Sequence, residues 1–302
     1  MTEIRENGKL RRAPFDLDGT RVIWNFTGTI HTPWKDVFRM AIHPTAIIDN
    51  RAELASDVSV GPYVVIDGPV KIGSGSIIKA SAVITGNTTI GERCQIFPHA
   101  VIGESGQDKH YQGEDSRVVI GDDCILREGV TVHRATGEGQ ETTIGDRCFL
   151  MSNAHVGHNC VVGNDAILIS GCLLGGHASI GERAVISGNT AIHQFVRIGT
   201  LAMLGGVAPV VQDVPPFTLT DHEGHVAGIN LVGLKRAGYT SEQRGEIKEA
   251  YRLLYRENLP LAQVVAMLSQ NDFSETLQPL IEFLNGSNRG ITKGSIRLRR
   301  AA

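Results

Sequence analysis

Residues 144–198 read IGDRCFLMSNAHVGHNCVVGNDAILISGCLLGGHASIGERAVISGNTAIHQFVRI, and every sixth residue of this stretch is aliphatic. The same period of six extends from Ile42 to Val210, where 26 of 29 positions are Ile, Leu or Val and the three exceptions are acidic. Strand side chains alternate between two faces, so a period this long predicts a β-helix built from hexapeptide repeats.

The neighbouring columns of the repeat fit this interpretation. Two residues before the aliphatic position the side chain is small, as at Ala154, and both columns would point inward. Glycine often follows the aliphatic residue, as at Gly157, which suits a corner with unusual backbone angles. Three hexads would form one coil of 18 residues, and coils would stack at roughly 4.8 Å.

Composition narrows the class of protein. The 302 residues contain only 5% aromatics, which fits a thin core of Ile, Val and Ala. No run of about 18 apolar residues and no apolar signal segment is present, so we expect a cytoplasmic protein without membrane insertion. All five cysteines fall in the small inward column, and without a CxxC pair they are expected to pack in the core.

The chain divides into three parts. Residues 1–40 lie outside the repeat and are interpreted as a cap for the open end of the solenoid. Residues 41–214 form the predicted β-helix, from which a polar loop at 105–118 and a smaller excursion at 135–142 extrude. Residues 215–302 are predicted to form a helical domain with a basic tail, in which Thr240 and Gln243 offer a capping box.

Charge is unevenly distributed between these parts. The net charge is −3, but residues 235–302 hold 11 Lys+Arg and 7 Asp+Glu, a balance of +4 that leaves −7 for the rest. Such a basic unit suits an acidic partner, and a solvated helical surface is the alternative.

Histidines are concentrated in the second half of the solenoid, and the repeat places His133, His155, His158 and His193 on its outer surface. His158, Gly176 and Gln194 are 18 residues apart and would stack on successive coils. An imidazole one strand spacing from a backbone N–H combines a general base with an oxyanion donor, the pair that acyl transfer needs.

A metal site is the competing interpretation of the same histidines. His155 and His158 with a third histidine could bind zinc, as in the carbonic anhydrases that share this type of solenoid. No HxxxxH pair of that type occurs in the coils, and no acidic cluster accompanies the histidines. We therefore expect no metal and no cofactor.

Longer motifs resemble one family, the UDP-N-acetylglucosamine acyltransferases, which are the first enzymes of lipid A synthesis. The resemblance covers about residues 41–293, and its motifs are Gly103-Glu-Ser-Gly-Gln-Asp-Lys-His-Tyr, Val130-Thr-Val-His-Arg, Asn153-Ala-His-Val-Gly-His-Asn, Ala191-Ile-His-Gln-Phe, Gln212-Asp-Val-Pro-Pro and Gly228-Ile-Asn-Leu-Val-Gly-Leu-Lys-Arg.

This resemblance implies a left-handed parallel β-helix and a homotrimer with active sites between subunits. It implies transfer of a 3-hydroxyacyl group from acyl carrier protein to the 3-position of UDP-N-acetylglucosamine, with no part for nucleic acid. His158 matches the general base, Gly176 the oxyanion donor, and Gly206 a position where glycine leaves a longer acyl groove. The positions that match substrate contacts are Gln107, Asp108, His133, His155, His177, His193 and Gln194, with Asn230 and Arg236 matching nucleotide contacts.

The chain departs from the family pattern at several positions. Asn159 stands where Asp is common beside the base, and an amide can turn its N–H₂ toward the imidazole and favour the wrong tautomer. His110, Val232 and Ala237 replace a usual Lys, Glu and Arg. These departures leave a 3-amino sugar or another nucleotide sugar open as the acceptor. A zinc lyase and a binding protein without catalysis are the alternatives outside acyl transfer.

Overall fold

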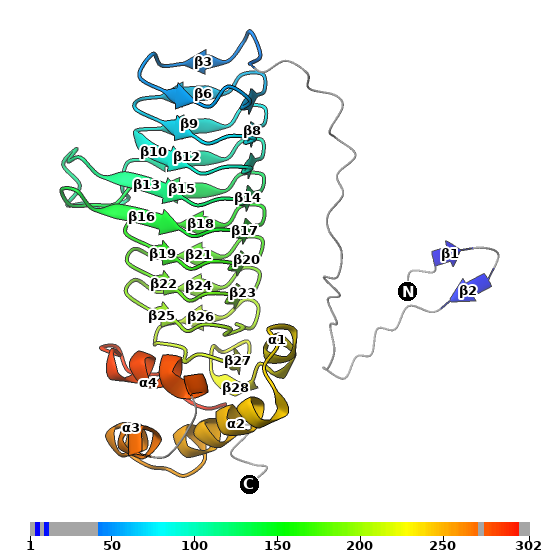
Figure 1. Ribbon diagram of the computed structural model, residues 1–302, viewed down its shortest axis with the longest axis vertical. Helices are drawn as coiled ribbons and strands as arrows, with labels where there is room; N and C mark the ends of the chain where they lie inside the picture. Colours follow the sequence, from blue (N-terminus) through cyan, green and yellow to red (C-terminus); the bar gives the residue numbers. More distant parts are fainter. Residues whose placement is uncertain (1–3, 7–8, 12–41, 271–274, 296–302) are drawn as a thin grey trace. The chain divides into compact units, whose positions relative to one another are not determined.

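The computed structural model describes residues 4–6, 9–11, 42–270 and 275–295 (Figure 1). The chain divides into two compact units, Met1–Val37 and Phe38–Ala302. In the first unit, β1 (Ile4–Glu6) and β2 (Lys9–Arg11) pair antiparallel. The rest of the segment expected to form a cap, including both tryptophans, lies outside the described residues.

The second unit begins with stacked coils in which every third strand pairs in parallel, so the strands form three sheets of eight, seven and nine (Figure 1). The β4 sheet contains β4 (Glu53–Leu54), β7 (Lys71–Ile72), β10 (Asn87–Ile90), β13 (Arg117–Ile120), β16 (Glu141–Ile144), β19 (Val161–Val162), β22 (Ser179–Ile180) and β25 (Arg197–Ile198). The β5 sheet contains β5 (Ser59–Val60), β8 (Ile77–Ile78), β11 (Gln95–Ile96), β14 (Ile125–Leu126), β17 (Phe149–Leu150), β20 (Ile167–Leu168) and β23 (Val185–Ile186). The β3 sheet contains β3 (Ile47–Ile48), β6 (Val65–Asp67), β9 (Val83–Thr85), β12 (Val101–Glu104), β15 (Thr131–His133), β18 (His155–Val156), β21 (Leu173–Leu174), β24 (Ala191–Ile192) and β26 (Pro209–Val210).

The inward columns of the hexads form a continuous core. Ala154 and Val156 illustrate the alternation, because both are fully buried while His155 between them faces outward. All five cysteines are free and buried, which confirms that they pack in the core.

The reason expected for the corner glycines was wrong. Among the glycines that directly follow an aliphatic column residue, only Gly103 has a positive φ, at 85°. The left-handed conformation falls two residues later, on non-glycine residues such as Asn159 (φ 59°) and His177 (φ 60°). The glycines are needed instead because the coils approach closely: a Cβ on Gly73 would lie 2.6 Å from the carbonyl carbon of Gly91 in the next coil.

Two loops leave the coils on the same side, between β12 and β13 and between β15 and β16 (Figure 1). They correspond to the two interruptions of the hexad pattern. Polar contacts join them, because the Glu114 carboxylate accepts the Gly137 N–H (2.6 Å) and the Asp115 carbonyl accepts the Gly139 N–H (2.7 Å).

Beyond the last coil the chain forms a short antiparallel pair and then helices. The elements are β27 (Thr218–Thr220), β28 (Val226–Ile229), α1 (Leu231–Arg236), α2 (Ser241–Tyr255), α3 (Leu261–Gln270), the 3₁₀ helix η2 (Glu275–Leu277) and α4 (Gln278–Asn285). The predicted capping box is present at the start of α2, where Thr240 and Gln243 bond reciprocally. Buried Asp213 ties the parts together, because its side chain accepts the Arg197 N–H and the Ser287 hydroxyl (both 2.9 Å). None of the helices within the described ranges is long and apolar enough to cross a membrane.

Candidate active site

The corner that follows the β3-sheet strands, here called the histidine corner, brings most of the predicted site residues together. His155 lies on β18, His158 follows that strand, Gly176 and His177 follow β21 on the next coil, and His193 and Gln194 follow β24 on the coil after that. The His177 N–H donates to the His158 carbonyl at 2.9 Å, which joins the coil of β18 to the coil of β21. The predicted stack of residues 18 apart is therefore present.

Gly176 provides the space that the His158 imidazole occupies. A Cβ on Gly176 would lie 2.3 Å from Nε2 of His158 and 2.5 Å from its Cε1, closer than any real contact. The ring thus lies directly over the glycine backbone. Because φ of Gly176 is not in the left-handed region, glycine is required there by space and not by conformation.

The backbone N–H of Gly176 donates no hydrogen bond to any of the described residues, so it is available to a ligand. The corner that follows the β4-sheet strands shows the contrast. There the equivalent N–H groups of Glu92 and Asp122 donate to the side chains of Asp122 and Asp146 on the next coil, at 2.8 and 2.9 Å. At the histidine corner Gln194 stands on the next coil, and this side chain is exposed and does not close the Gly176 N–H.

Asn159 orients His158, and Asn159 is itself held by a contact with Thr136 that the sequence did not predict. The Asn159 amide pairs with the peptide groups of Thr136: its Oδ1 accepts the Thr136 N–H (2.9 Å) and its Nδ2 donates to the Thr136 carbonyl (3.1 Å). This pairing defines which end of the amide is oxygen. Nδ1 of His158 lies 2.9 Å from that oxygen, so Nδ1 carries the proton and Nε2 has the free lone pair.

Three further predicted histidines surround this centre. His155 is half-buried with Nδ1 2.8 Å from the Thr131 hydroxyl, and burial, with His133 and His158 nearby, lowers the pKa of His155 to about 4. Burial beside His158 also lowers the pKa of His177. His133 donates from Nδ1 to the Ser105 carbonyl (2.8 Å), which connects the corner to the first extruded loop.

The first loop brings its acid to the same place. Asp108 accepts the backbone N–H of His110 (2.9 Å) and lies 2.9 Å from that residue's Nδ1, and these contacts lower the pKa of Asp108. His158 adds a smaller electrostatic contribution to this lowered pKa, and Asp108 in turn partly offsets the lowering of the pKa of His177. Gln107, next to it, is exposed.

The remaining predicted residues lie further along the chain. Gly206 is exposed on the last coil, and Arg236 is exposed in the last turn of α1. Asn230 is buried and caps α1: its Oδ1 accepts the Gly233 N–H and its Nδ2 donates to the Leu201 carbonyl, both at 2.9 Å. Its amide is thus engaged within the fold.

Phe195 also lies at the histidine corner, and the sequence analysis did not include it among the candidate site residues. Its ring is half-exposed and stacks on His177 at 4.5 Å between centroids, while His177 meets His158 edge-on at 5.2 Å. The signal was in the spacing, since Phe195 follows His177 by 18 residues. A cavity of about 460 Å³ opens beside Asn159 and His177, and neither His158 nor Gly176 lines it.

The histidine corner does not provide a set of three metal ligands among the described residues. The three metal-ligating side chains that approach within 4.8 Å are Asp221, Glu223 and His225, in the turn between β27 and β28. Asp221 already accepts the backbone N–H groups of Glu223 and His225 at 2.9 and 3.0 Å. Those bonds explain the cluster as turn structure.

Comparison with known proteins gives one consistent family. The family described as Udp N-acetylglucosamine O-acyltransferase, domain 2, matches residues 213–292, and bacterial transferase hexapeptide repeats match 51–86 and 141–176. The acyl-[acyl-carrier-protein]–UDP-N-acetylglucosamine O-acyltransferase of Anaeromyxobacter is 41% identical over 257 residues, which is 84% of this chain and 100% of that protein. Its counterpart in Xanthomonas oryzae is 46% identical over 256 residues, 83% and 97% of the two chains.

Solved structures agree. The crystal structure of UDP-N-acetylglucosamine O-acyltransferase from Moraxella catarrhalis has a TM-score of 0.82 at 36% identity and covers 84% of this chain and all of that one. The Arabidopsis enzyme has a TM-score of 0.73 at 30% identity, with 83% and 100% covered. The predicted fold, a left-handed parallel β-helix followed by helices, is confirmed by these neighbours. The chain belongs to the family of acyl-[acyl-carrier-protein]–UDP-N-acetylglucosamine O-acyltransferases.

Proposed function

We propose that this protein transfers a 3-hydroxyacyl group from acyl carrier protein to the 3-hydroxyl of UDP-N-acetylglucosamine, the first step of lipid A biosynthesis. Family membership supports the reaction class. One observation carries the mechanism: His158 Nε2, with its lone pair free, lies over Gly176, whose backbone N–H has no acceptor among the described residues.

His158 acts as the general base in this mechanism. Nε2 removes the proton of the acceptor hydroxyl while Nδ1–H stays bonded to Asn159 Oδ1. The acceptor oxygen then attacks the thioester carbonyl carbon. The low pKa of neighbouring His155 keeps that ring neutral near pH 7, so it adds no second positive charge beside the imidazolium that forms.

The tetrahedral intermediate needs a donor for its oxyanion, which the Gly176 N–H supplies. Collapse of the intermediate breaks the carbon–sulfur bond. The proton held on Nε2 passes to the leaving thiolate of the carrier, which returns His158 to its starting form. Around this centre, the proposed substrate contacts are Gln107, Asp108, His133, His155, His177, His193 and Gln194. Further along the chain, Arg236 would contact the nucleotide and Gly206 the acyl chain, while Asn230, whose amide caps α1, would hold the start of that helix beside the nucleotide.

A homotrimer with shared active sites is part of the proposal. The outward residues of the β3 sheet are largely apolar, and Ile47 and Leu173 are 67% and 49% exposed in the single chain. His155 and Thr131 lie in the same outward column. Such a strip is normally covered by a partner, and its position would bring a second subunit to the histidine corner. A stable monomer in light scattering at micromolar concentration would contradict this.

Carrier protein is expected to bind near α2. Arg244, Lys248, Arg252 and Arg256 recur every four residues and so follow one face of that helix. Arg252 is paired with Glu249 at 2.7 Å and also with Glu257, which neutralises part of this stripe. The basic tail that the sequence offered for the same purpose lies outside the described residues.

The test is a direct assay with purified protein, 3-hydroxyacyl carrier protein and two acceptors, UDP-N-acetylglucosamine and its 3-amino analogue. We expect ester formation on the first. The amine is a second candidate acceptor because Asn159, a neutral partner, supports the imidazolium less than a carboxylate would, and an amine needs less help from a base. If kcat/KM is at least about tenfold higher for the 3-amino sugar, that sugar replaces UDP-N-acetylglucosamine as the proposed acceptor. If neither sugar is turned over, the proposal is refuted.

A further inference from the structure

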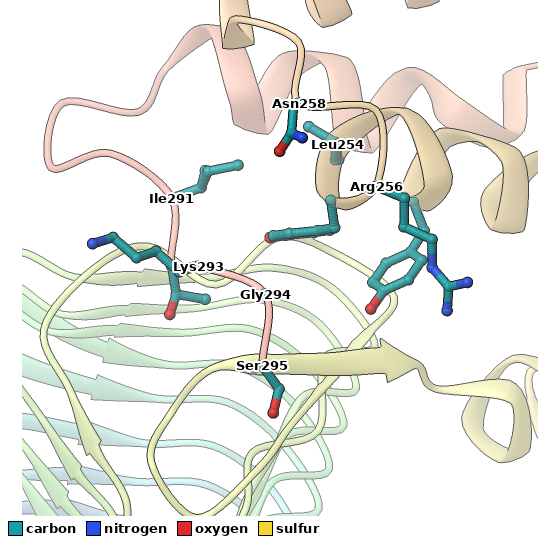
Figure 2. A pocket seen from close by; sticks show the side chains of 10 residues that line it. Leu254, Arg256, Asn258, Ile291, Lys293, Gly294 and Ser295 are labelled. Carbon is teal, nitrogen blue, oxygen red and sulfur yellow. The ribbon is translucent and has the colours of Figure 1, made fainter. Parts of the chain in front are cut away.

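A cavity of about 490 Å³ lies in the C-terminal part of the second unit (Figure 2), and none of the residues that line it belongs to the histidine corner. The end of α2 and the turn that follows it form one wall, with Leu254 and Asn258. Segment 291–295 forms the other wall, with Ile291 and Gly294. Figure 2 shows the two walls facing each other across the cavity.

Two tyrosine hydroxyls that line this cavity are buried and have no hydrogen-bond partner among the described residues: those of Tyr251 and Tyr255. Tyr251 is only 7% exposed. The other wall differs, because Thr292 and Ser295 already bond their hydroxyls to the turn between β27 and β28. A buried hydroxyl without a partner is costly, so the phenols are the groups that this cavity leaves for a ligand.

The chemistry of the lining favours an anion. Burial raises the pKa of both phenols, so they remain neutral donors at physiological pH. Asn258 adds an amide, and none of the described residues that line the cavity carries a carboxylate. Lys293 and Arg256 lie at its rim with their charged ends pointing outward on opposite sides, as Figure 2 shows, so they provide positive potential and not direct contacts.

Gly294 is adapted to the same arrangement. A Cβ at this position would lie 3.3 Å from Cδ1 of Tyr255, so the glycine lets the tyrosine ring lie against the backbone. The ring of Tyr251 lies 5.1 Å from that of Tyr255 between centroids, so the two rings are neighbours in the same wall. Leu254 and Ile291 supply apolar surface beside them.

We propose that this cavity is a second ligand site, which binds a small organic oxyanion, a carboxylate or a phosphate ester with a short apolar part, through the hydroxyls of Tyr251 and Tyr255. The site is separate from the acyl-transfer centre. It does not depend on the function proposed above.

The experiment is calorimetric titration of the full-length protein with phenyl phosphate, with benzoate and with neutral benzyl alcohol. We expect saturable binding of at least one anion and none of the alcohol, and the better anion identifies the class of oxyanion. The double variant Tyr251→Phe/Tyr255→Phe keeps both rings, and removing hydrogen bonds to a charged ligand should weaken binding at least about tenfold. Tyr63→Phe, which changes a hydroxyl of an exposed tyrosine on the solenoid, should bind as the unmodified protein does.

Unfolding temperature without ligand provides a second measurement. Because the two hydroxyls have no partner in the described fold, the double variant should unfold at the same temperature or higher. Absence of anion binding by the unmodified protein, or equal binding by the double variant, would show that the cavity holds only water. A clear fall in unfolding temperature would show that the phenols bond within the protein, and would also overturn the proposal.

Discussion

Replacement of Gly176 by alanine tests the catalytic geometry most directly. The new Cβ would lie 2.3 Å from Nε2 of His158, whereas an ordinary contact needs about 3.5 Å. The imidazole must therefore move by about 1 Å. Since a misplacement of about 1 Å can reduce a rate by about 10²-fold, we expect kcat/KM to fall by that amount. The Gly176 N–H itself is kept, so the loss would report on the position of the base.

The fold should tolerate this change, because the clash is with the far end of a side chain and φ of Gly176 is not positive. Two matched variants separate activity from stability. Gly175→Ala would place its Cβ 2.8 Å from the backbone N of Gln194 and should lower the unfolding temperature. Gly245→Ala meets nothing within 4 Å on α2 and should stabilise slightly, by up to about 1 kcal/mol, with unchanged activity.

The assay measures kcat and KM with 3-hydroxyacyl carrier protein and UDP-N-acetylglucosamine, together with unfolding temperature for each variant. If Gly176→Ala stays folded and keeps at least half of the original kcat/KM, then Nε2 of His158 does not act from its place over Gly176. The mechanism would then need another base.

Three further outcomes are expected. His158→Ala should reduce kcat by about 10²–10⁴-fold with little change in unfolding temperature, because the residue is on the outer surface; near-full activity would remove it from the mechanism. The pKa of His155 is lowered from 6.5 in the unfolded chain to about 4, so its stabilising effect is complete above pH 6.5 and is lost as pH falls toward 4; a scan of unfolding temperature against pH should therefore be flatter for His155→Gln, and parallel curves would contradict this. Lys248→Ala on α2 should raise the KM for acyl carrier protein, more at low salt than at high salt, and a KM unchanged at every salt concentration would place the carrier elsewhere.

The solenoid was predictable because one sequence period determines both which side chains are buried and where coils repeat. An 18-residue coil also made the stack of His158 on Gly176 predictable, since residues 18 apart meet wherever the hexads are unbroken. The reason for the corner glycines was not predictable, because it depends on the approach of the next coil, which a period in one chain does not specify. Phe195 was overlooked although the same spacing places it on His177.

The contact between Asn159 and Thr136 could not be predicted from the sequence for a different reason. Thr136 belongs to an extruded loop, where the hexad register is interrupted and spacing no longer indicates position. In the folded protein, that loop determines which end of the Asn159 amide faces His158. The Asn159 Nδ2 donates to the Thr136 carbonyl, so the amide oxygen is the end that faces His158. An aspartate in this place would turn a carboxylate oxygen toward the Thr136 carbonyl, about where a hydrogen bond now lies. The amide and the loop therefore suit each other, and together they define the tautomer without a charge. The cost is weaker support for the imidazolium, which makes the nature of the acceptor nucleophile matter more here than it would beside a carboxylate.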